Sequence, residues 1–233
     1  MNPPPTFSGF PQKGLTFFKE LAKNNDKLWF DEHRSDYAHY VLGPARDFIV
    51  ALGVRLKTIA PGIQADPRVN KTLFRINRDT RFRLDKTPYK THLALWFWEG
   101  SRPRMECSGF YFHLEPAKLL LGVGLYCFPR DMVDAYRQSV VHPQEGKALA
   151  QALSKVKGTG TYQIGGKHFK KIPSGYDPKH PQAEFLLYNG LHAAVDFEIS
   201  PEFFSAGLVD FCFAHYKNML PLHRWLLALT QRV

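Results

Sequence analysis

A dense cluster of charged side chains in the middle of the chain is the strongest chemical signal in the sequence. From Arg68 to Lys90 there are eight basic residues and two acidic ones, an excess of six positive charges. The whole 233-residue chain has a formal net charge of +10, so more than half of the excess lies in this short stretch. A local positive field of this kind concentrates anionic ligands such as phosphates, nucleotides or nucleic acids.

Arginine supplies the hydrogen-bonding geometry that such a ligand needs. A guanidinium group donates paired hydrogen bonds to the oxygens of a phosphate or carboxylate, and it keeps its charge. Asp79 and Asp85 lie among these cations, where their carboxylates can orient neighbouring arginines. Pro88 restricts its own backbone and favours an extended conformation at Thr87, so we expect a rigid loop. The residues predicted to bind the ligand are Arg75, Arg78, Arg81, Asp85, Lys86, Tyr89, Lys90, His92 and Lys171.

Two residues are candidates for acid–base catalysis. Asp79 lies inside the cluster, and His180 lies in a second basic, turn-rich segment, residues 170–180, which also contains Lys171. Histidine side chains in general can transfer protons near neutral pH. A histidine directly before a proline can instead hydrogen-bond to the helix that follows, so both interpretations of His180 stay open.

An internal salt-bridge network is the competing interpretation of the cluster. The two aspartates inside it cannot neutralise eight basic residues, but carboxylates elsewhere in the chain could supply further partners. Those that we considered are Asp31, Glu32, Asp36 and Asp47. In such a network the loop would be pinned to neighbouring helices and would bind no ligand.

The sequence lacks the short motifs of common cofactor and metal sites. It contains no G-x-x-x-x-G-K-[ST], no G-x-S-x-G and no H-E-x-x-H. Gly122 and Gly124 lack the third glycine and the following helix of a dinucleotide fingerprint. The ten histidines show no i, i+4 pair and no metal-binding spacing with cysteine. We therefore expect no cofactor and no metal, and the sequence leaves open whether the protein is an enzyme.

Composition also limits the compartment and the partners. The three cysteines are scattered among apolar neighbours without C-x-x-C spacing, which indicates free thiols in a reducing compartment. No run of about 18 apolar residues is present, and the first residues lack the basic and apolar regions of a secretory signal. We therefore expect a cytoplasmic protein with no membrane partner. The net charge also suits nucleic acid, although no recognised nucleic-acid-binding motif is present.

Hydrophobic periodicity predicts an α+β fold in a single domain, residues 1–233. Helices are expected at residues 11–25, 26–41, 44–59, 129–140, 143–156 and 181–188, and in two further helices between 201 and 231 that are broken at Pro221. Alternating patterns predict successive strands at residues 92–98, 108–115 and 119–126, with others at 73–76 and 191–199. Together they predict a curved antiparallel β-sheet meander with helices packed on one face and helical N- and C-terminal segments.

The central cluster also resembles a known family. Residues 74–92 read F-R-I-N-R-D-T-R-F-R-L-D-K-T-P-Y-K-T-H. This run resembles the R-x-x-R-D-T-R-F-x-x-D-K-T-P-Y-K-T-H signature of the family catalogued as domain of unknown function 2461. The likeness continues in F-S-G-F-P and N-N-D-K-L-W-F near the start and in K-K-I-P-S-G-Y-D-P-K-H-P at residues 170–181. The resemblance covers essentially the whole chain and supports a single domain, but it implies no activity and no cofactor.

Four functions are consistent with the sequence. The first is binding of a phosphate-bearing or other anionic small molecule in a basic pocket built around residues 75–92, where Tyr89 would stack on the ligand or donate a hydrogen bond. The second is an enzyme acting on a phosphorylated substrate, and the third is a nucleic-acid-binding module. The fourth is a structural network without a ligand. The oligomeric state is left open.

Overall fold

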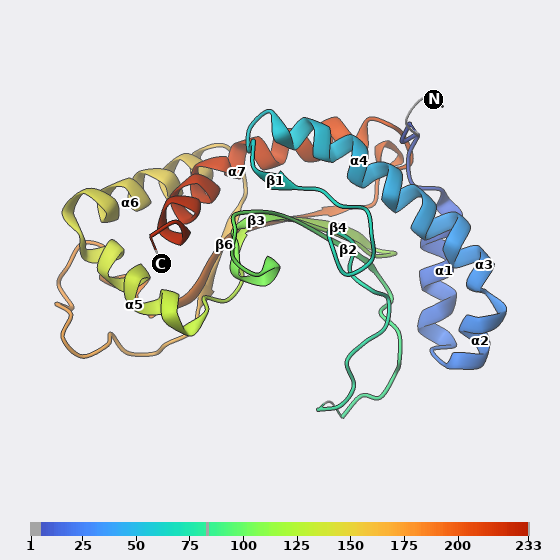
Figure 1. Cartoon of the computed structure of the whole chain (residues 1–233), viewed down its shortest axis with the longest axis horizontal. Helices are drawn as coiled ribbons and strands as arrows, with labels where there is room; N and C mark the ends of the chain where they lie inside the picture. Colours follow the sequence, from blue (N-terminus) through green and yellow to red (C-terminus); the bar gives the residue numbers. More distant parts are fainter. Residues whose placement is uncertain (1–5, 83, 233) are drawn as a thin grey trace. The chain divides into compact units, whose positions relative to one another are not determined.

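The computed structural model describes residues 6–82 and 84–232 (Figure 1). Its antiparallel sheet has six strands in the order β1-β2-β3-β4-β6-β5. The strands are β1 (Ile63–Gln64), β2 (Leu93–Glu99), β3 (Gly109–Leu114), β4 (Lys118–Leu125), β5 (Gln163–Lys167) and β6 (Tyr188–Glu198). Because β2, β3 and β4 are neighbours both in sequence and in the sheet, the predicted antiparallel meander is confirmed.

α-Helices precede and follow this meander, and two of them separate β4 from β5. The α-helices are α1 (Gln12–Lys23), α2 (Lys27–Glu32), α3 (Arg34–Tyr37), α4 (Gly43–Lys57), α5 (Arg130–Val141), α6 (Pro143–Gly158) and α7 (Leu208–Thr230). A π-helical turn (Ala38–Leu42) joins α3 to α4, and short 3₁₀ turns lie at Arg104–Glu106, Ala183–Leu187 and Pro201–Phe204. The α+β class is therefore confirmed. None of the helices in the described residues is long and apolar enough to cross a membrane.

The chain divides into two compact units, each built from segments that are far apart in sequence. Unit 1 contains the residues up to Phe97, together with Tyr111–Leu120 and Asp196–Ala214. Unit 2 contains Trp98–Phe110, Leu121–Val195 and the residues from His215 onward. The expectation of a single domain stays a prediction.

Aromatic side chains form the core of unit 1 where α4 packs on β3. The ring centroids of Phe48 on α4 and Phe112 on β3 are 4.8 Å apart, and Phe7 and Phe10 pack against Phe48 at 5.0 and 5.4 Å. All four side chains are buried. Such edge-to-face and tilted contacts stabilise beyond the area that they bury. Phe110 and Phe112 lie on the same face of β3 because they are two residues apart in a strand. The packing of Phe48 on Phe112 therefore places α4 on that face of the sheet.

In unit 2 the helix α7 packs on the start of β3. The ring of Tyr216 lies 5.3 Å from that of Phe110, and both are buried. The sequence analysis placed a break at Pro221, and that expectation is wrong because α7 continues through this residue. Proline costs about 3 kcal/mol inside a helix. Met219 and Leu222, on either side of Pro221, are fully buried, so their packing outweighs that cost.

The segment before the basic cluster differs from the predicted strand at residues 73–76. It forms isolated bridges, from Leu73 to Leu95 and from Asn77 to Tyr89, in place of a continuous strand. The Trp96 amide also donates to the Thr72 carbonyl at 2.8 Å. Residues 72–77 therefore contact β2 and the residues before it only at isolated positions. They lead directly into the loop that carries the cluster.

Candidate anion-binding site

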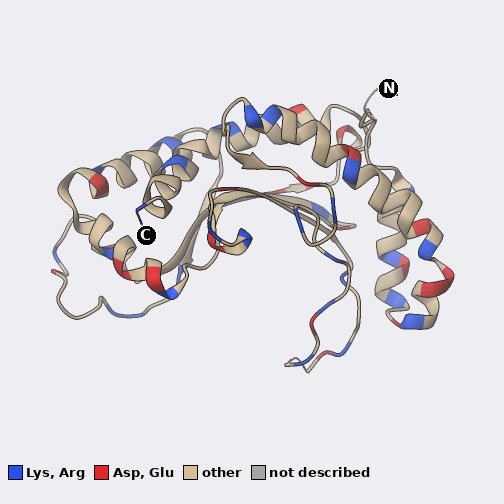
Figure 2. Ribbon diagram, viewed as in Figure 1, with Lys and Arg blue, Asp and Glu red and all other residues tan. Residues whose placement is uncertain are grey.

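The basic cluster forms a loop in unit 1 whose two arms are hydrogen-bonded at the base. Asn77 pairs with Tyr89 in an antiparallel bridge, and the Lys90 amide donates to the Ile76 carbonyl at 2.8 Å. Figure 1 shows this segment, between β1 and β2, extending away from the sheet. Figure 2 shows both basic and acidic residues along it. Residues 77–89 are from here on called the basic loop.

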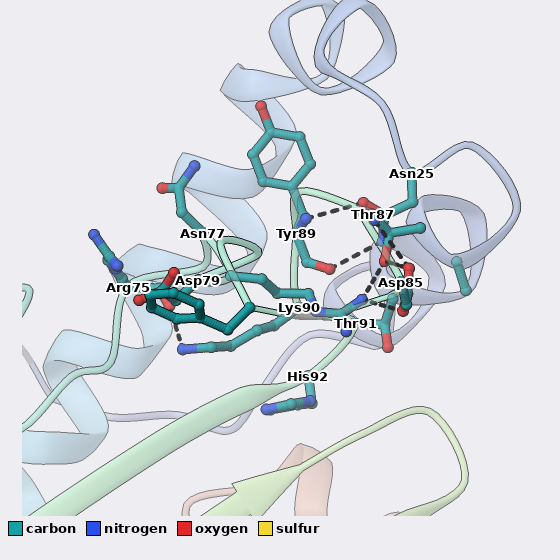
Figure 3. A pocket seen from close by; sticks show the side chains of 13 residues that line it. Asn25, Arg75, Asn77, Asp79, Asp85, Thr87, Tyr89, Lys90, Thr91 and His92 are labelled. Carbon is teal, nitrogen blue, oxygen red and sulfur yellow. Dashed lines mark hydrogen bonds and ion pairs between the residues drawn. The ribbon is translucent and has the colours of Figure 1, made fainter.

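Asn25, directly after α1, fastens one arm of the basic loop to the helices. Its side-chain amide donates to the Tyr89 carbonyl and accepts from the Tyr89 amide, both at 3.0 Å (Figure 3). The Tyr89 ring stacks on Phe30 of α2, with centroids 4.2 Å apart, and is 6% exposed. Asn25 thus bonds both the N–H and the C=O of Tyr89, as a neighbouring β-strand would. Both the backbone and the ring of Tyr89 therefore fix this arm of the loop to the helices.

Aspartates within the basic loop orient two of its arginines, as the sequence analysis expected. Arg81 donates from Nε to Asp79 Oδ1 at 3.0 Å and from Nη2 to Oδ2 at 2.7 Å. Arg78 donates from Nη1 to Asp85 Oδ2 at 2.6 Å and also to the Thr87 hydroxyl. Charge-assisted hydrogen bonds of this kind fix the direction of a guanidinium group.

These contacts keep both carboxylates ionised. The Arg81 guanidinium holds the pKa of Asp79 well below its usual range. The Thr87 backbone N–H, together with Arg78, lowers the pKa of Asp85 to about 2. At neutral pH both groups are therefore hydrogen-bond acceptors, which suits an orienting role.

The other cations of the cluster are held differently. Lys86 Nζ donates to the Thr80 carbonyl at 2.9 Å, and Lys90 Nζ donates to the Arg75 carbonyl at 2.8 Å. These carbonyls position the ammonium groups without neutralising them. The Arg75 guanidinium makes no hydrogen bond and no ion pair with any residue in 6–82 or 84–232. Asp31, which we considered as a distant partner, pairs with Lys27 and Arg34.

A cavity of about 970 Å³ lies between the basic loop and the end of α1 (Figure 3). Its charged lining residues are Arg75, Arg78, Lys90, Asp79 and Asp85. Neutral polar groups come from Asn25, Asn77, Thr87, Thr91 and His92, and apolar surface comes from Ala22, Phe82 and Tyr89. A concave site of this size with a few convergent polar groups is typical of a small-molecule site.

His92 contributes a neutral imidazole to this cavity. Burial, reinforced by His113, Lys90 and Arg78, lowers the pKa of His92 to about 4. Its ring stacks on His113 with centroids 4.1 Å apart, and His113 Nδ1 lies 3.0 Å from the Tyr111 hydroxyl. At neutral pH His92 can therefore donate and accept hydrogen bonds but adds no charge to the site.

Six of the residues predicted to bind the ligand line this cavity. They are Arg75, Arg78, Asp85, Tyr89, Lys90 and His92. Arg81 and Lys86 belong to the basic loop but are absent from the lining, and Lys171 belongs to unit 2 whereas every lining residue belongs to unit 1. Of the catalytic candidates, Asp79 lines the cavity. His180 belongs to unit 2, where its Nδ1 accepts from the Gln182 amide at 3.2 Å, as in the hydrogen-bonding interpretation.

The sequence analysis missed three lining residues that shape the site. Asn77 and Phe82 lie inside the basic run, so their position in the sequence indicated that they could belong to the site. They were not selected because the prediction in this run was based mainly on charged residues. Asn25 was interpreted only as the end of a helix. Nothing local in the sequence indicates that it contacts Tyr89, a residue 64 positions away.

A second polar network lies in unit 2 and is fully enclosed. His223 Nδ1 lies 3.0 Å from the Ser108 hydroxyl, and its Nε2 lies 2.8 Å from Glu99 Oε2. The order of groups resembles that of a catalytic triad. However, Ser108, His223 and Glu99 are only 0%, 1% and 8% exposed, so a substrate cannot reach the hydroxyl. We interpret this network as structural.

No group of three or more His, Cys, Asp or Glu in the described part of the chain could hold a metal ion. No curated protein matches the chain. The sequence model of the family described as conserved hypothetical protein (DUF2461) matches residues 13–225. That range includes α1 except its first residue, and it includes the basic loop, every lining residue of the cavity and Pro221. The chain therefore belongs to the DUF2461 family of conserved hypothetical proteins.

Proposed function

We propose that the chain binds a phosphate-bearing or other anionic small molecule in the cavity beside the basic loop. One observation carries the proposal: Arg75 lines the cavity, and its guanidinium has no hydrogen-bond or ion-pair partner among the described residues. An arginine fork that is not paired within the protein can donate to an anion without first losing an internal bond. A phosphate oxygen pair has the matching geometry.

Arg78 and Lys90 support the same proposal. Both line the cavity, and hydrogen bonds to Asp85 and to the Arg75 carbonyl set their directions before a ligand arrives. Prior orientation lowers the entropy lost on binding. In this proposal the ion pair of Arg78 with Asp85 holds a cavity-lining guanidinium in place, so Arg78 belongs to both the salt-bridge network and the site.

A small molecule fits these features better than a nucleic acid does. Three cations, Arg75, Arg78 and Lys90, converge on one cavity, whereas nucleic-acid binding generally uses a basic stripe or groove that follows a phosphate backbone. An enzyme acting on a phosphorylated substrate stays a prediction. In that case the same arginines would stabilise developing negative charge.

Thermal melting against a panel of anions tests the proposal. The panel contains phosphate, pyrophosphate, sugar phosphates, nucleotides and short RNA, all at fixed ionic strength. A ligand at a hundred times its dissociation constant stabilises the folded state by about 2.7 kcal/mol. For a chain of this size that corresponds to a shift of about 5–10 °C in Tm.

Arg75→Ala is the decisive variant. We expect it to lose the ligand-induced shift and to keep its ligand-free Tm, because the Arg75 side chain makes no internal bond among the described residues. Arg46→Ala, which removes an exposed arginine of α4 outside the cavity lining, is the matched control and should keep both. No shift with any anion would refute the proposal. A shift with RNA alone, with steep salt dependence, would favour nucleic-acid binding in its place.

A further inference from the structure

We infer that the ligand is a nucleoside phosphate, whose phosphate binds Arg75 and whose base stacks on Phe82. The inference rests on the proposed function and names the class of ligand. It begins from the three aromatic rings that line the cavity, those of Tyr89, His92 and Phe82.

Two of these rings already have an aromatic partner. Tyr89 stacks on Phe30 with centroids 4.2 Å apart and planes 20° apart and is only 6% exposed, so little of its ring is open to a ligand. His92 stacks in the same way on His113, at 4.1 Å and 24°. Phe82 has no ring partner among the described residues and is 92% exposed. Phe82 is therefore the ring of the three that leaves most of its surface open to a ligand in the cavity.

The Phe82 ring is nevertheless braced. The Arg81 guanidinium lies 5.7 Å from the ring centroid, and Asp79 holds that guanidinium through two hydrogen bonds. Lys86 closes the loop further through its bond to the Thr80 carbonyl. Because Phe82 is 92% exposed, the Arg81 guanidinium leaves most of the ring open. A planar base can therefore stack on the open face, a contact that all bases make because each has a π-face.

The dimensions and remaining polar groups of the cavity fit the same class of ligand. A volume of about 970 Å³ is far more than a lone phosphate fills and lies in the range of pockets for drug-sized molecules. Asn77 lines the cavity, and its side-chain amide makes no hydrogen bond to a described residue. An amide both donates and accepts, and this pattern complements the edge of a base such as adenine.

The test compares three ligands by calorimetric titration: pyrophosphate, ribose 5-phosphate and adenosine diphosphate. The variants are Phe82→Ala, Phe82→Trp and Leu84→Ala. Leu84 is the matched control because it is 102% exposed on the same loop but does not line the cavity. We expect wild type to bind the nucleotide at least tenfold more tightly than pyrophosphate. Phe82→Ala should lose about tenfold in nucleotide affinity, the size of one stacking contact. It should leave pyrophosphate binding unchanged, Phe82→Trp should keep the nucleotide affinity, and Leu84→Ala should change neither ligand.

Failure of this inference differs from failure of the proposed function. If pyrophosphate binds and the nucleotide binds no more tightly, the inference is overturned and the anion site stands. If ribose 5-phosphate and the nucleotide both bind more tightly than pyrophosphate and by the same factor, the added affinity comes from the sugar, and the inference is also overturned. A Phe82→Ala variant that loses both ligands equally would do the same, because the ring would then act through the loop and not by stacking. If none of the three ligands binds, the proposed function fails as well.

Discussion

Replacing Asn25 by alanine should loosen the basic loop and weaken binding at the proposed anion site without removing any charge. The structure assigns Asn25 two hydrogen bonds, both 3.0 Å long, to the backbone of Tyr89. A typical intramolecular hydrogen bond contributes about 1 kcal/mol net, and an unsatisfied buried group costs about 1–3 kcal/mol. Because Asn25 is only partly buried, water replaces part of what is lost. We therefore expect the free energy of loop opening to fall by about 2 kcal/mol, which is about a 30-fold loss of protection.

Amide hydrogen exchange of the segment around Tyr89, followed by mass spectrometry, measures this directly. Asn24→Ala is the matched control, because the neighbouring Asn24 side chain donates only to the Glu20 carbonyl of its own helix among the described residues. Asn25→Asp is the informative third variant. It keeps an acceptor for the Tyr89 amide but replaces the donor with an oxygen that faces the Tyr89 carbonyl.

We expect the amides around Tyr89 to be equally protected from exchange in wild type and in Asn24→Ala. They should be less protected in Asn25→Asp and in Asn25→Ala. Pyrophosphate affinity should follow the same order, since a loop that opens more often spends less time in the binding-competent arrangement. Unchanged exchange at Tyr89 in Asn25→Ala, or an equal effect of Asn24→Ala, would refute the claim that this amide anchors the loop.

Three further predictions follow from the charged and polar networks. Arg78→Ala should lower the ligand-free Tm whereas Arg75→Ala should not, because only Arg78 is bonded within the loop; equal Tm values in differential scanning fluorimetry would contradict this. Removing either His223 or Glu99 deletes the 2.8 Å hydrogen bond between these two buried side chains, so each single alanine variant should cost about 1–3 kcal/mol in urea unfolding, and the double variant should cost less than the sum; additive costs would show that the pair is not coupled. As the pH is lowered from 6.5 to 4, the unfolded chain binds a proton at His92 and the folded chain does not, so the free energy of unfolding should decrease by up to about 3 kcal/mol. His92→Gln should make the free energy of unfolding depend less on pH in this range. An unchanged pH dependence would mean that His92 is not buried as described.

Local patterns in the sequence determined the class of fold because they reflect interactions between near neighbours. Alternation along β3, with Phe110 and Phe112 on one face, identified a strand with a buried side. Helical spacing located α5 and α6 to within one or two residues. The aspartates inside the cluster were likewise correctly expected to orient arginines, since Asp79 and Arg81 are two residues apart and their pairing needs no distant segment.

Tertiary structure decided the features that depend on distant segments. Pro221 was expected to end a helix, and α7 continues because burial of the flanking residues outweighs a local propensity. Asn25 and Tyr89 meet only because the loop folds back onto the end of α1. Their contact forms one side of the cavity.

The sequence also did not indicate which of the cations are bonded within the protein and which are not. Arg75 and Arg78 differ by three positions and are chemically identical, yet one is bonded to Asp85 and the other lines the cavity without a bond among the described residues. The sequence by itself determined that this stretch is basic, and it led us to expect a rigid loop that binds an anion. Only the folded chain decided which guanidinium is bonded to Asp85 and which has no partner among the described residues, because that depends on where each side chain points in the folded loop.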